Sequence, residues 1–282
     1  MKYRFIREHQ HQYPVQMLCN VMQVSRSQYY AWRPAPESSG LVGQELHIRM
    51  RSLFSESEQS LGSRSMTAQL RKEGFSIGRH RVRKLMKDLK LSVKRKRQYV
   101  VTTESQHSEP VAPNLLDRNF NPAGPNQIWS TDITYIKTRQ GWVYLAVVLD
   151  LYSRRVVGWH IDRQMTVTLV SRALRMAINL RQPPRGLLHH SDRGVQYACK
   201  DYQKLLQEHG MRCSMSRKGN CWDNAPTERF FGSLKRERVS WRAYHDLREV
   251  QRDVSSYMLY YNTRRLHSTL NYRTPVAYEL GR

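Results

Sequence analysis

The sequence predicts an α/β fold in which helices lie on the faces of a mixed sheet, preceded by an all-helical region. Two observations lead to this prediction. From residue 128 onward, runs rich in β-branched and aromatic residues alternate with amphipathic segments, as strands and helices do along an α/β chain. Residues 14–91 instead show mainly the helical period, and a basic, proline-containing segment separates the two regions.

The composition is that of a globular protein with a polyanionic partner. Of 282 residues, 39% are hydrophobic and 25% charged, and no run approaches the roughly 20 apolar residues of a membrane span. Lys2, Arg4 and Arg7 interrupt any apolar leader, so we expect a cytoplasmic, nucleoid-associated protein that does not bind membranes. The formal charge of +24 favours nucleic acid, because each neutralised phosphate releases counterions.

Residues 1–40 are predicted to form an N-terminal helix-turn-helix domain. Two short helices are expected within residues 14–32, and Ser25 is a suitable cap for the second. The second helix of such a motif enters the major groove of DNA. Its outward residues would be Arg26, Gln28 and Tyr29. The alternative is an ordinary helical hairpin.

A second helical DNA-binding domain is predicted over residues 41–91, with its first helix starting near Gln44. Its last helix, from about residue 78, is basic on one face and apolar on the other, which favours a second recognition helix over a merely solvated face. The linker 92–125 opens with a basic run expected to contact phosphates without reading sequence. The predicted DNA contacts in these two segments are Arg79, Arg81, Arg83, Lys84, Lys94, Arg95, Lys96 and Arg97.

Residues 126–282 are predicted to form one α/β domain with a helical tail. Three strands are expected at 128–138, 141–151 and 155–161. The elements expected after them are a helix at 166–180, a strand at 187–190, a helix at 199–210, a strand at 211–215, and helices at 224–238 and 247–261. This order describes a ribonuclease-H-like fold.

Three acidic residues lie at the boundaries of these elements. Asp132 falls on the first strand, Asp192 just past the fourth, and Glu228 at the start of a helix. Strands one and four would be neighbours, so the carboxylates can meet at one edge of the sheet. Three carboxylates can hold two Mg²⁺ ions, or Mn²⁺ in their place, and paired divalent ions drive phosphodiester chemistry on nucleic acid.

Two polar neighbours are expected to support this site. His190 precedes Asp192 by two residues and so shares its face on a strand. It would assist the metal ligands or contact phosphate, or else be a packed histidine. Asn224, together with Asp223, is expected to cap the helix that carries Glu228.

The same helix offers contacts to DNA. Lys235 lies seven residues after Glu228, on the same helical face, where it would hold a phosphate near the metals. Arg229 is assigned to DNA with it. Asp150 and Asp223 are rival metal ligands of lower rank.

The motifs around the acids are similar to those of a known family. The blocks Trp-Ser-Thr-Asp-Ile-Thr-Tyr from Trp129, His-Ser-Asp-Arg-Gly from His190, and Asn-Ala-Pro-Thr-Glu-Arg-Phe-Phe from Asn224 resemble the signatures of DDE transposases. The nearest match is the OrfB-type catalytic subunit of bacterial insertion sequences, related to retroviral integrases. The segment Tyr-Tyr-Asn-Thr-Arg-Arg-Leu-His from Tyr260 resembles that family's C-terminal block. The zinc module of the retroviral relatives is missing.

The resemblance implies a reaction and partners. Such enzymes cut the inverted-repeat ends of their element and join 3′-hydroxyls to DNA with Mg²⁺, which makes Asp132, Asp192 and Glu228 the metal ligands. They act as dimers or larger assemblies, often with a small upstream helix-turn-helix partner or as a frameshift fusion to it.

Three other kinds of protein would explain part of this sequence. A DNA-binding regulator, or an inactive partner subunit with a nuclease-like fold, would not need all three acids. A tyrosine recombinase would spread its arginines and histidine far from the nucleophilic tyrosine, whereas Arg264, Arg265, His267 and Tyr272 lie close together. A structural RNA-binding protein would explain the charge but not the acids.

Overall fold

In the computed structural model, the described residues are 1–32, 38–93, 111–217 and 220–281. The chain divides into two compact units, Met1–Ser52 and Leu53–Arg282, which are described separately. Residues 33–37 and the basic run Lys94, Arg95, Lys96 and Arg97 lie outside the described residues. No helix in the described ranges is long and apolar enough to span a membrane.

The first unit begins with three short helices, α1 (Lys2–His9), α2 (Val15–Val21) and α3 (Arg26–Trp32). The last two are the two short helices expected within residues 14–32, with α3 starting directly after Ser25. Helix α1 was not predicted, because Ile6 is its only buried residue and gives no apolar period. The small core combines Ile6, Leu18, Cys19 and Tyr29.

The prediction that Tyr29 faces DNA is wrong. Its side chain has no exposed surface, and its ring centroid lies 6.2 Å from that of Tyr3. Its hydroxyl donates to Oε1 of Gln10 at 3.3 Å. A helix this short must bury at least one large side chain to be stable, and Tyr29 has that role in α3.

Three further helices precede the sheet: α4 (Ser38–Glu56), α5 (Ser63–Lys72) and α6 (Arg79–Asp88). Helix α4 starts at Ser38, earlier than the expected start near Gln44. Helices α5 and α6 pack against each other. Their buried side chains include Met66, Leu70, Val82 and Met86, at the spacing of one helical face.

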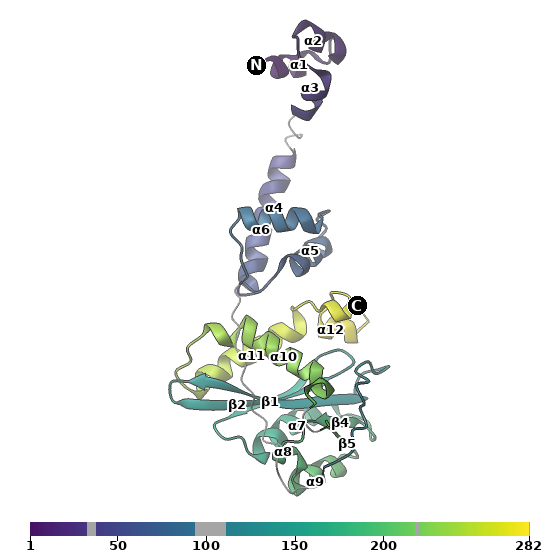
Figure 1. The fold of residues 1–282 in the computed structure, drawn as a ribbon, viewed down its shortest axis with the longest axis vertical. Coiled ribbons are helices and arrows are strands. Elements are labelled where there is room, and N and C mark those ends of the chain that lie inside the picture. Colours follow the sequence, from purple (N-terminus) through teal and green to yellow (C-terminus); the bar gives the residue numbers. More distant parts are fainter. Residues whose placement is uncertain (33–37, 94–110, 218–219, 282) are drawn as a thin grey trace. The chain divides into compact units, whose positions relative to one another are not determined.

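The remaining chain forms a five-stranded sheet in the order β3-β2-β1-β4-β5. The first three strands form an antiparallel meander, and β4 and β5 are parallel to β1 (Figure 1). The strands are β1 (Ile128–Thr138), β2 (Gly141–Asp150), β3 (Val156–Asp162), β4 (Leu188–Ser191) and β5 (Arg212–Met215). This confirms the mixed sheet of a ribonuclease-H-like fold, including the pairing of the first and fourth strands.

Helices cover both faces of the sheet (Figure 1). One face packs against α10 (Ala225–Glu237) and α11 (Leu247–Thr263), and the other against α7 (Val167–Arg181), α8 (Val195–Ala198) and α9 (Lys200–Glu208). Side chains along β2 point alternately to the two faces of the sheet. Val147 and Leu149 belong to the hydrophobic core under α10 and α11, whereas Ala146 and Val148 belong to the core under α7, α8 and α9. A short helix, α12 (Pro275–Glu279), ends the tail.

Candidate active site

Sheet pairing brings two of the acids together. The parallel register of β1 and β4 pairs Ser130 with His190. Asp132 and Asp192 each lie two residues further along, with Asp192 just past the end of β4, and the charge of Asp192 is near enough to raise the pKa of Asp132. Neighbouring strands lie about 4.8 Å apart. An Oδ1 atom of Asp132 accepts the amide of Ile133 at 2.8 Å. In Asp192, Oδ1 accepts the amide of Gly194 at 2.9 Å, which forms the turn into α8.

The third acid is delivered by the first turn of α10, which is fixed to β1 by a buried polar cluster. Asn224 donates to the carbonyl of Thr131 at 3.1 Å and accepts from the hydroxyl of Ser130. The Ser130 hydroxyl also lies 2.7 Å from that of Thr227. Because Thr131 and Thr227 directly precede Asp132 and Glu228, these contacts set the distance between the two acids.

The charges at this edge repel one another. Burial raises the pKa of Asp132 well above its ordinary value, and the nearby charges of Asp192 and then Glu228 raise it further. Glu228 lies at the surface, and the partial desolvation of its carboxylate raises its pKa. Lys235 is the nearby cation: its charge partly opposes the rise at Asp132, and its ammonium lies 4.6 Å from the ring centroid of Tyr135.

The donor set fits a hard divalent cation. The carboxylates come from β1, the end of β4 and α10. The charges of Asp192 and Glu228 act on Asp132, and the charge of Lys235 partly offsets them. Carboxylate oxygens are ligands that magnesium prefers. Within the described ranges, no three His, Cys, Asp or Glu side chains are already arranged to hold a metal ion. Mutual repulsion of carboxylates is expected to keep them apart until a cation neutralises them.

The far end of α10 is also fixed. Glu237, in its last turn, accepts from Arg265 through Nε at 2.9 Å and Nη2 at 2.7 Å. The hydroxyl of Tyr257 donates to the same carboxylate at 2.9 Å. Arg265 is four-fifths buried, so this paired contact is held with little competition from water. Both Glu228 and Lys235 therefore lie on a helix anchored at its two ends.

Comparison with known sequences identifies the family. Models described as integrase core domains match residues 122–221 and 209–275, and an HTH-like domain matches residues 43–99. The chain is 38% identical to the transposase InsF for insertion sequence IS3A of Escherichia coli K12, over 99% of this chain and 98% of that protein. It is 40% identical to an uncharacterized 31 kDa protein of insertion element IS600 from Shigella sonnei, over 93% and 97% of the two chains.

The chain belongs to the integrase-core transposases of insertion sequences. It is a polynucleotidyl transferase of the DDE type. The fold agrees: a chain of the simian T-cell lymphotropic virus intasome, solved with the PP2A regulatory subunit B56 gamma, superimposes with a TM-score of 0.50 at 17% identity, covering 82% of this chain and 74% of that one.

His190 is a packed residue of the transposase core rather than an open ligand. It has no exposed surface. Its Nδ1 lies 2.9 Å from the hydroxyl of Ser214, and its Nε2 lies 3.2 Å from that of Ser216. Burial lowers its pKa to about 4. Of the roles weighed for it, the buried one fits these contacts.

The rival acid Asp150 has a structural environment. It is fully buried and accepts the amides of Asn126 at 2.8 Å and Tyr152 at 2.9 Å. An Arg181 guanidinium nitrogen lies 3.6 Å from it. Its carboxylate thus closes the loop at the end of β2.

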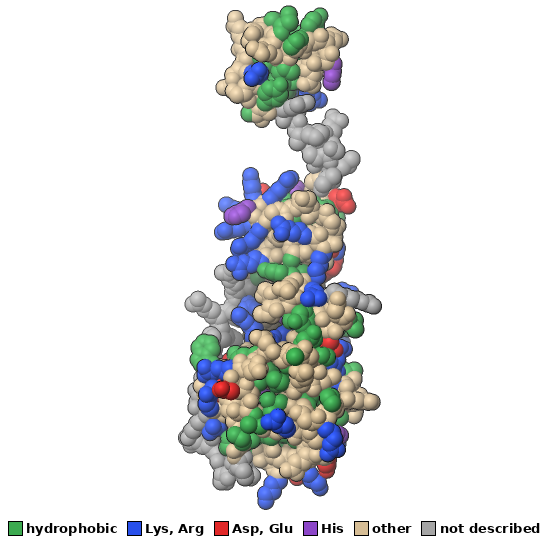
Figure 2. Space-filling model, turned by 90° about the vertical axis from the view of Figure 1, so that its right-hand side faces the viewer, with side chains coloured by type: hydrophobic (Ala, Val, Ile, Leu, Met, Phe, Trp, Pro, Cys, Tyr) green, Lys and Arg blue, Asp and Glu red, His purple; other side chains and the backbone are tan. Residues whose placement is uncertain are grey.

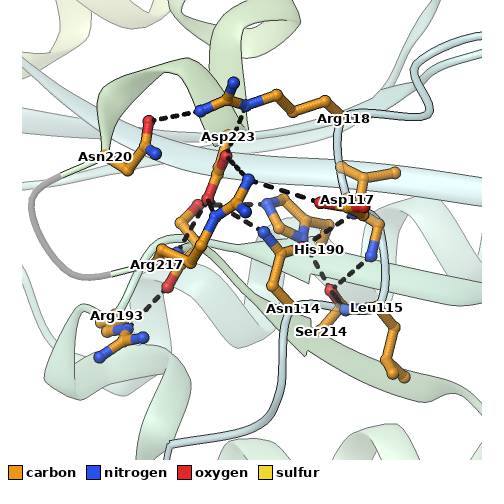
Figure 3. Close-up of polar contacts among 12 residues, drawn as sticks. Asn114, Leu115, Asp117, Arg118, His190, Arg193, Ser214, Arg217, Asn220 and Asp223 are labelled. Carbon is orange, nitrogen blue, oxygen red and sulfur yellow. Dashed lines mark hydrogen bonds and ion pairs between the residues drawn. The ribbon is translucent and has the colours of Figure 1, made fainter.

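Asp223 is the centre of a network that the sequence did not indicate (Figure 3). Its buried carboxylate accepts from Asn114 Nδ2 at 3.0 Å and Arg118 Nε at 3.0 Å. Arg217 donates from its amide, Nε and Nη2 at 2.9–3.0 Å. The Arg217 hydrogen bonds are the main reason that the pKa of Asp223 is well below its usual range. The partners lie up to 109 positions away, too far for a local pattern to show.

The expectation that Asp223 and Asn224 cap α10 is wrong. Asn224 is the N-cap residue, but its side chain makes no capping hydrogen bond and instead binds β1. Asp223 lies in the preceding 3-10 turn η1 (Cys221–Asn224) and points to the arginines. Both side chains join α10 to the sheet region, a tertiary role that local capping rules cannot predict.

The predicted DNA-contacting residues in α3 and α6 are exposed apart from Tyr29. In α3, Arg26 and Gln28 are on the surface. In α6, so are Arg79, Arg81, Arg83 and Lys84, and Lys and Arg side chains gather over this part of the chain (Figure 2). Arg229 is exposed beside Glu228.

Proposed function

We propose that this transposase binds the inverted-repeat ends of its insertion sequence, cleaves them, and joins the resulting 3′-hydroxyls to DNA. The observation that carries the proposal is the rise in the pKa of Asp132 caused by burial together with Asp192 and Glu228. Three carboxylates from separate elements, with the charges of two of them raising the pKa of the third, serve a cation better than they serve stability.

Asp132, Asp192 and Glu228 would hold two Mg²⁺ ions, or Mn²⁺ in their place. When bound, such ions activate an attacking water or 3′-hydroxyl and stabilise the departing oxygen. The protein's own part is geometric: Asn224 and Thr227 fix the helix that carries Glu228 to β1. Lys235, whose ammonium lies over the Tyr135 ring and feels the charge of Asp132, would bind a phosphate oxygen there.

DNA recognition is assigned to the helical regions. Arg26 and Gln28 on α3 and the basic residues of α6 would contact the element ends, and the run from Lys94 to Arg97 would contact phosphates. Arg229 and Lys235 would hold DNA at the acids. Two ends must be paired, so we propose a dimer or larger assembly, with a small upstream partner or a frameshift fusion to it. The protein would act in the cytoplasm, associated with the nucleoid.

The test is strand transfer by the purified full-length protein on labelled element ends, with Mg²⁺ or with EDTA. We expect Glu228→Gln and Asp192→Asn to lose joining but keep end binding. Glu208→Gln, which changes an exposed glutamate at the end of α9, is the matched control and should join normally. Metal-independent joining would reject the role of the acids. Tight end binding without joining by the wild type would favour a regulator or a subunit that needs its partner.

The assignment of α6 is tested by salt dependence. Arg83→Ala should weaken end binding and lower the slope of log K against log salt by about 1, because one phosphate contact is lost. Arg175→Ala, an exposed arginine on α7, is the control. Equal slopes for both variants and the wild type would remove α6 from the DNA-binding surface.

A further inference from the structure

A solvent-exposed tryptophan lies in the turn just before the catalytic helix. Trp222 is 69% exposed, compared with 38% for Trp32, 49% for Trp142 and 37% for Trp241. An indole is a large apolar group whose burial is favourable, and exposed indoles are common where one face later meets a partner. Trp222 lies in η1, six residues before Glu228, and so is close in sequence to the acid that would act on the DNA substrate.

The turn that carries Trp222 is held firmly by the residues after it. Asp223 is buried and accepts from Asn114, Arg118 and Arg217 (Figure 3). Asn224 is bound to the Thr131 carbonyl on β1. With both following side chains anchored, the backbone of the turn is fixed. The exposed indole is therefore presented by a rigid support, which lowers the entropy lost on binding.

The surroundings of Trp222 fit nucleic acid better than an apolar protein partner. Arg118 and Arg217 form ion pairs with Asp223, the residue that follows Trp222. Their side chains are 47% and 48% exposed. Docking an apolar protein surface requires a contiguous apolar patch, whereas the partly exposed side chains joined to this turn through Asp223 are arginines. Alternation of an aromatic ring with positive charge is the pattern that binds single-stranded DNA, with bases on the rings and phosphates on the cations.

We propose that Trp222 stacks on a nucleobase of the DNA strand whose phosphate reaches Asp132, Asp192 and Glu228. Asn224 links the turn to the residue before Asp132, so a base stacked there would set the register of the strand at the acids. The base must be unpaired, because a face is open for stacking only at a frayed or single-stranded position. This inference rests on the proposed function.

The stacking is tested by photocross-linking. Full-length protein is mixed with element ends that carry 5-iodouracil at each of the last positions of either strand in turn. After irradiation, the cross-linked residue is identified by mass spectrometry. We expect cross-links to Trp222 at one position or two adjacent ones. Trp222→Phe should keep them, whereas Trp222→Leu, which is apolar but not aromatic, should lose them.

Binding and joining are measured in parallel. Loss of one stacked base should weaken binding of the end by about 10- to 100-fold in Trp222→Leu and much less in Trp222→Phe. Trp142→Leu removes another exposed indole and is the control. Unchanged melting temperatures are required, as expected for a surface side chain.

The outcomes separate this inference from the proposed function. Cross-linking needs binding but no chemistry, so it is repeated with Glu228→Gln. Cross-links to Trp222 without any joining by the wild type would reject the proposed function and leave stacking in place. Normal joining with no cross-link to Trp222, or equal losses in Trp222→Leu and Trp222→Phe, would overturn the stacking.

Discussion

The substitution Asp223→Asn removes one negative charge from the network before α10 while keeping nearly the same shape. At neutral pH the carboxylate is ionised, because the Arg217 hydrogen bonds and the Arg118 contact hold its pKa well below the usual range. An asparagine can accept from some of these donors but cannot compensate two guanidinium charges. The turn that joins β5 to Glu228 would therefore loosen.

The cost in stability follows from the burial of the partners. Removing one member of a buried ion pair costs about 3–5 kcal/mol, whereas an exposed pair contributes below about 1 kcal/mol. Asp223 is buried, but the side chains of Arg118 and Arg217 are 47% and 48% exposed. A value near 2 kcal/mol, between these limits, is expected, which corresponds to a melting temperature lower by about 6 °C for a unit of this size.

The loss of strand-transfer rate in Asp223→Asn should be larger than its loss of stability alone would cause. Asn224 follows Asp223 directly and holds the first turn of α10 on β1, so a looser turn displaces Glu228. A misplacement of about 1 Å in a catalytic group costs about 100-fold in rate. The assay is the initial rate of strand transfer with Mg²⁺, measured well below the melting temperature found by circular dichroism.

The matched control is Asp253→Asn. Asp253 is also a buried aspartate with two arginine partners, Arg238 at 3.1 Å and Arg242 at 2.6 Å, but it lies on α11. Asp253→Asn should lower the melting temperature by at least as much, because Arg238 is only 8% exposed, and it should change the joining rate by less than about threefold. Equal losses of joining in the two variants would show that Asp223 acts only through stability, and full activity of Asp223→Asn would refute the positioning argument.

Two further predictions concern the core. Gly158→Ala should destabilise the full chain by about 3 kcal/mol or prevent folding, seen as a lower urea midpoint, because an added Cβ on β3 would overlap the carbonyl oxygen of Ala173 in α7; an unchanged midpoint would contradict this close packing. Stability should also fall as the pH is lowered below about 6.5. The reason is that burial lowers the pKa of His190 to about 4 and of His189 and His267 to about 3. Below about pH 6.5 the unfolded chain then binds more protons than the folded one, and stability falls by up to about 1.4 kcal/mol per pH unit for each histidine. Urea midpoints that stay constant between pH 7 and pH 5 would contradict these buried, neutral histidines.

The order of strands and helices in the catalytic region could be predicted because each element carries its own period. β2 is apolar on both faces, and α7 has a clear apolar stripe, so neither depends on distant context for recognition. The meeting of Asp132 and Asp192 follows from the same order, since it requires only that the first and fourth strands pair in parallel. That part of the site is encoded locally.

The rest depends on contacts between distant segments. Nothing near Tyr29 shows that α1 will cover it, because α1 itself has too few apolar residues to be predicted. Likewise, the partners of Asp223 come from two other segments, the chain before β1 and the end of β5. A pattern in sequence reports which face of an element is apolar, but it does not report which polar side chains will meet across an edge.

The C-terminal tail illustrates how tertiary contacts settle a choice that sequence leaves open. Arg265 and His267, two of the residue types that a recombinase site would use, are mostly buried, and Arg265 donates to Glu237 at the end of α10. Such a guanidinium is committed to one carboxylate and is not free to activate a phosphate. Because Asn224 holds the other end of α10 on β1, the tail and the sheet together determine where Glu228 and the lysine two turns later stand. In this chain, Arg265 of the C-terminal segment is thus best understood as a support for the helix that carries Glu228.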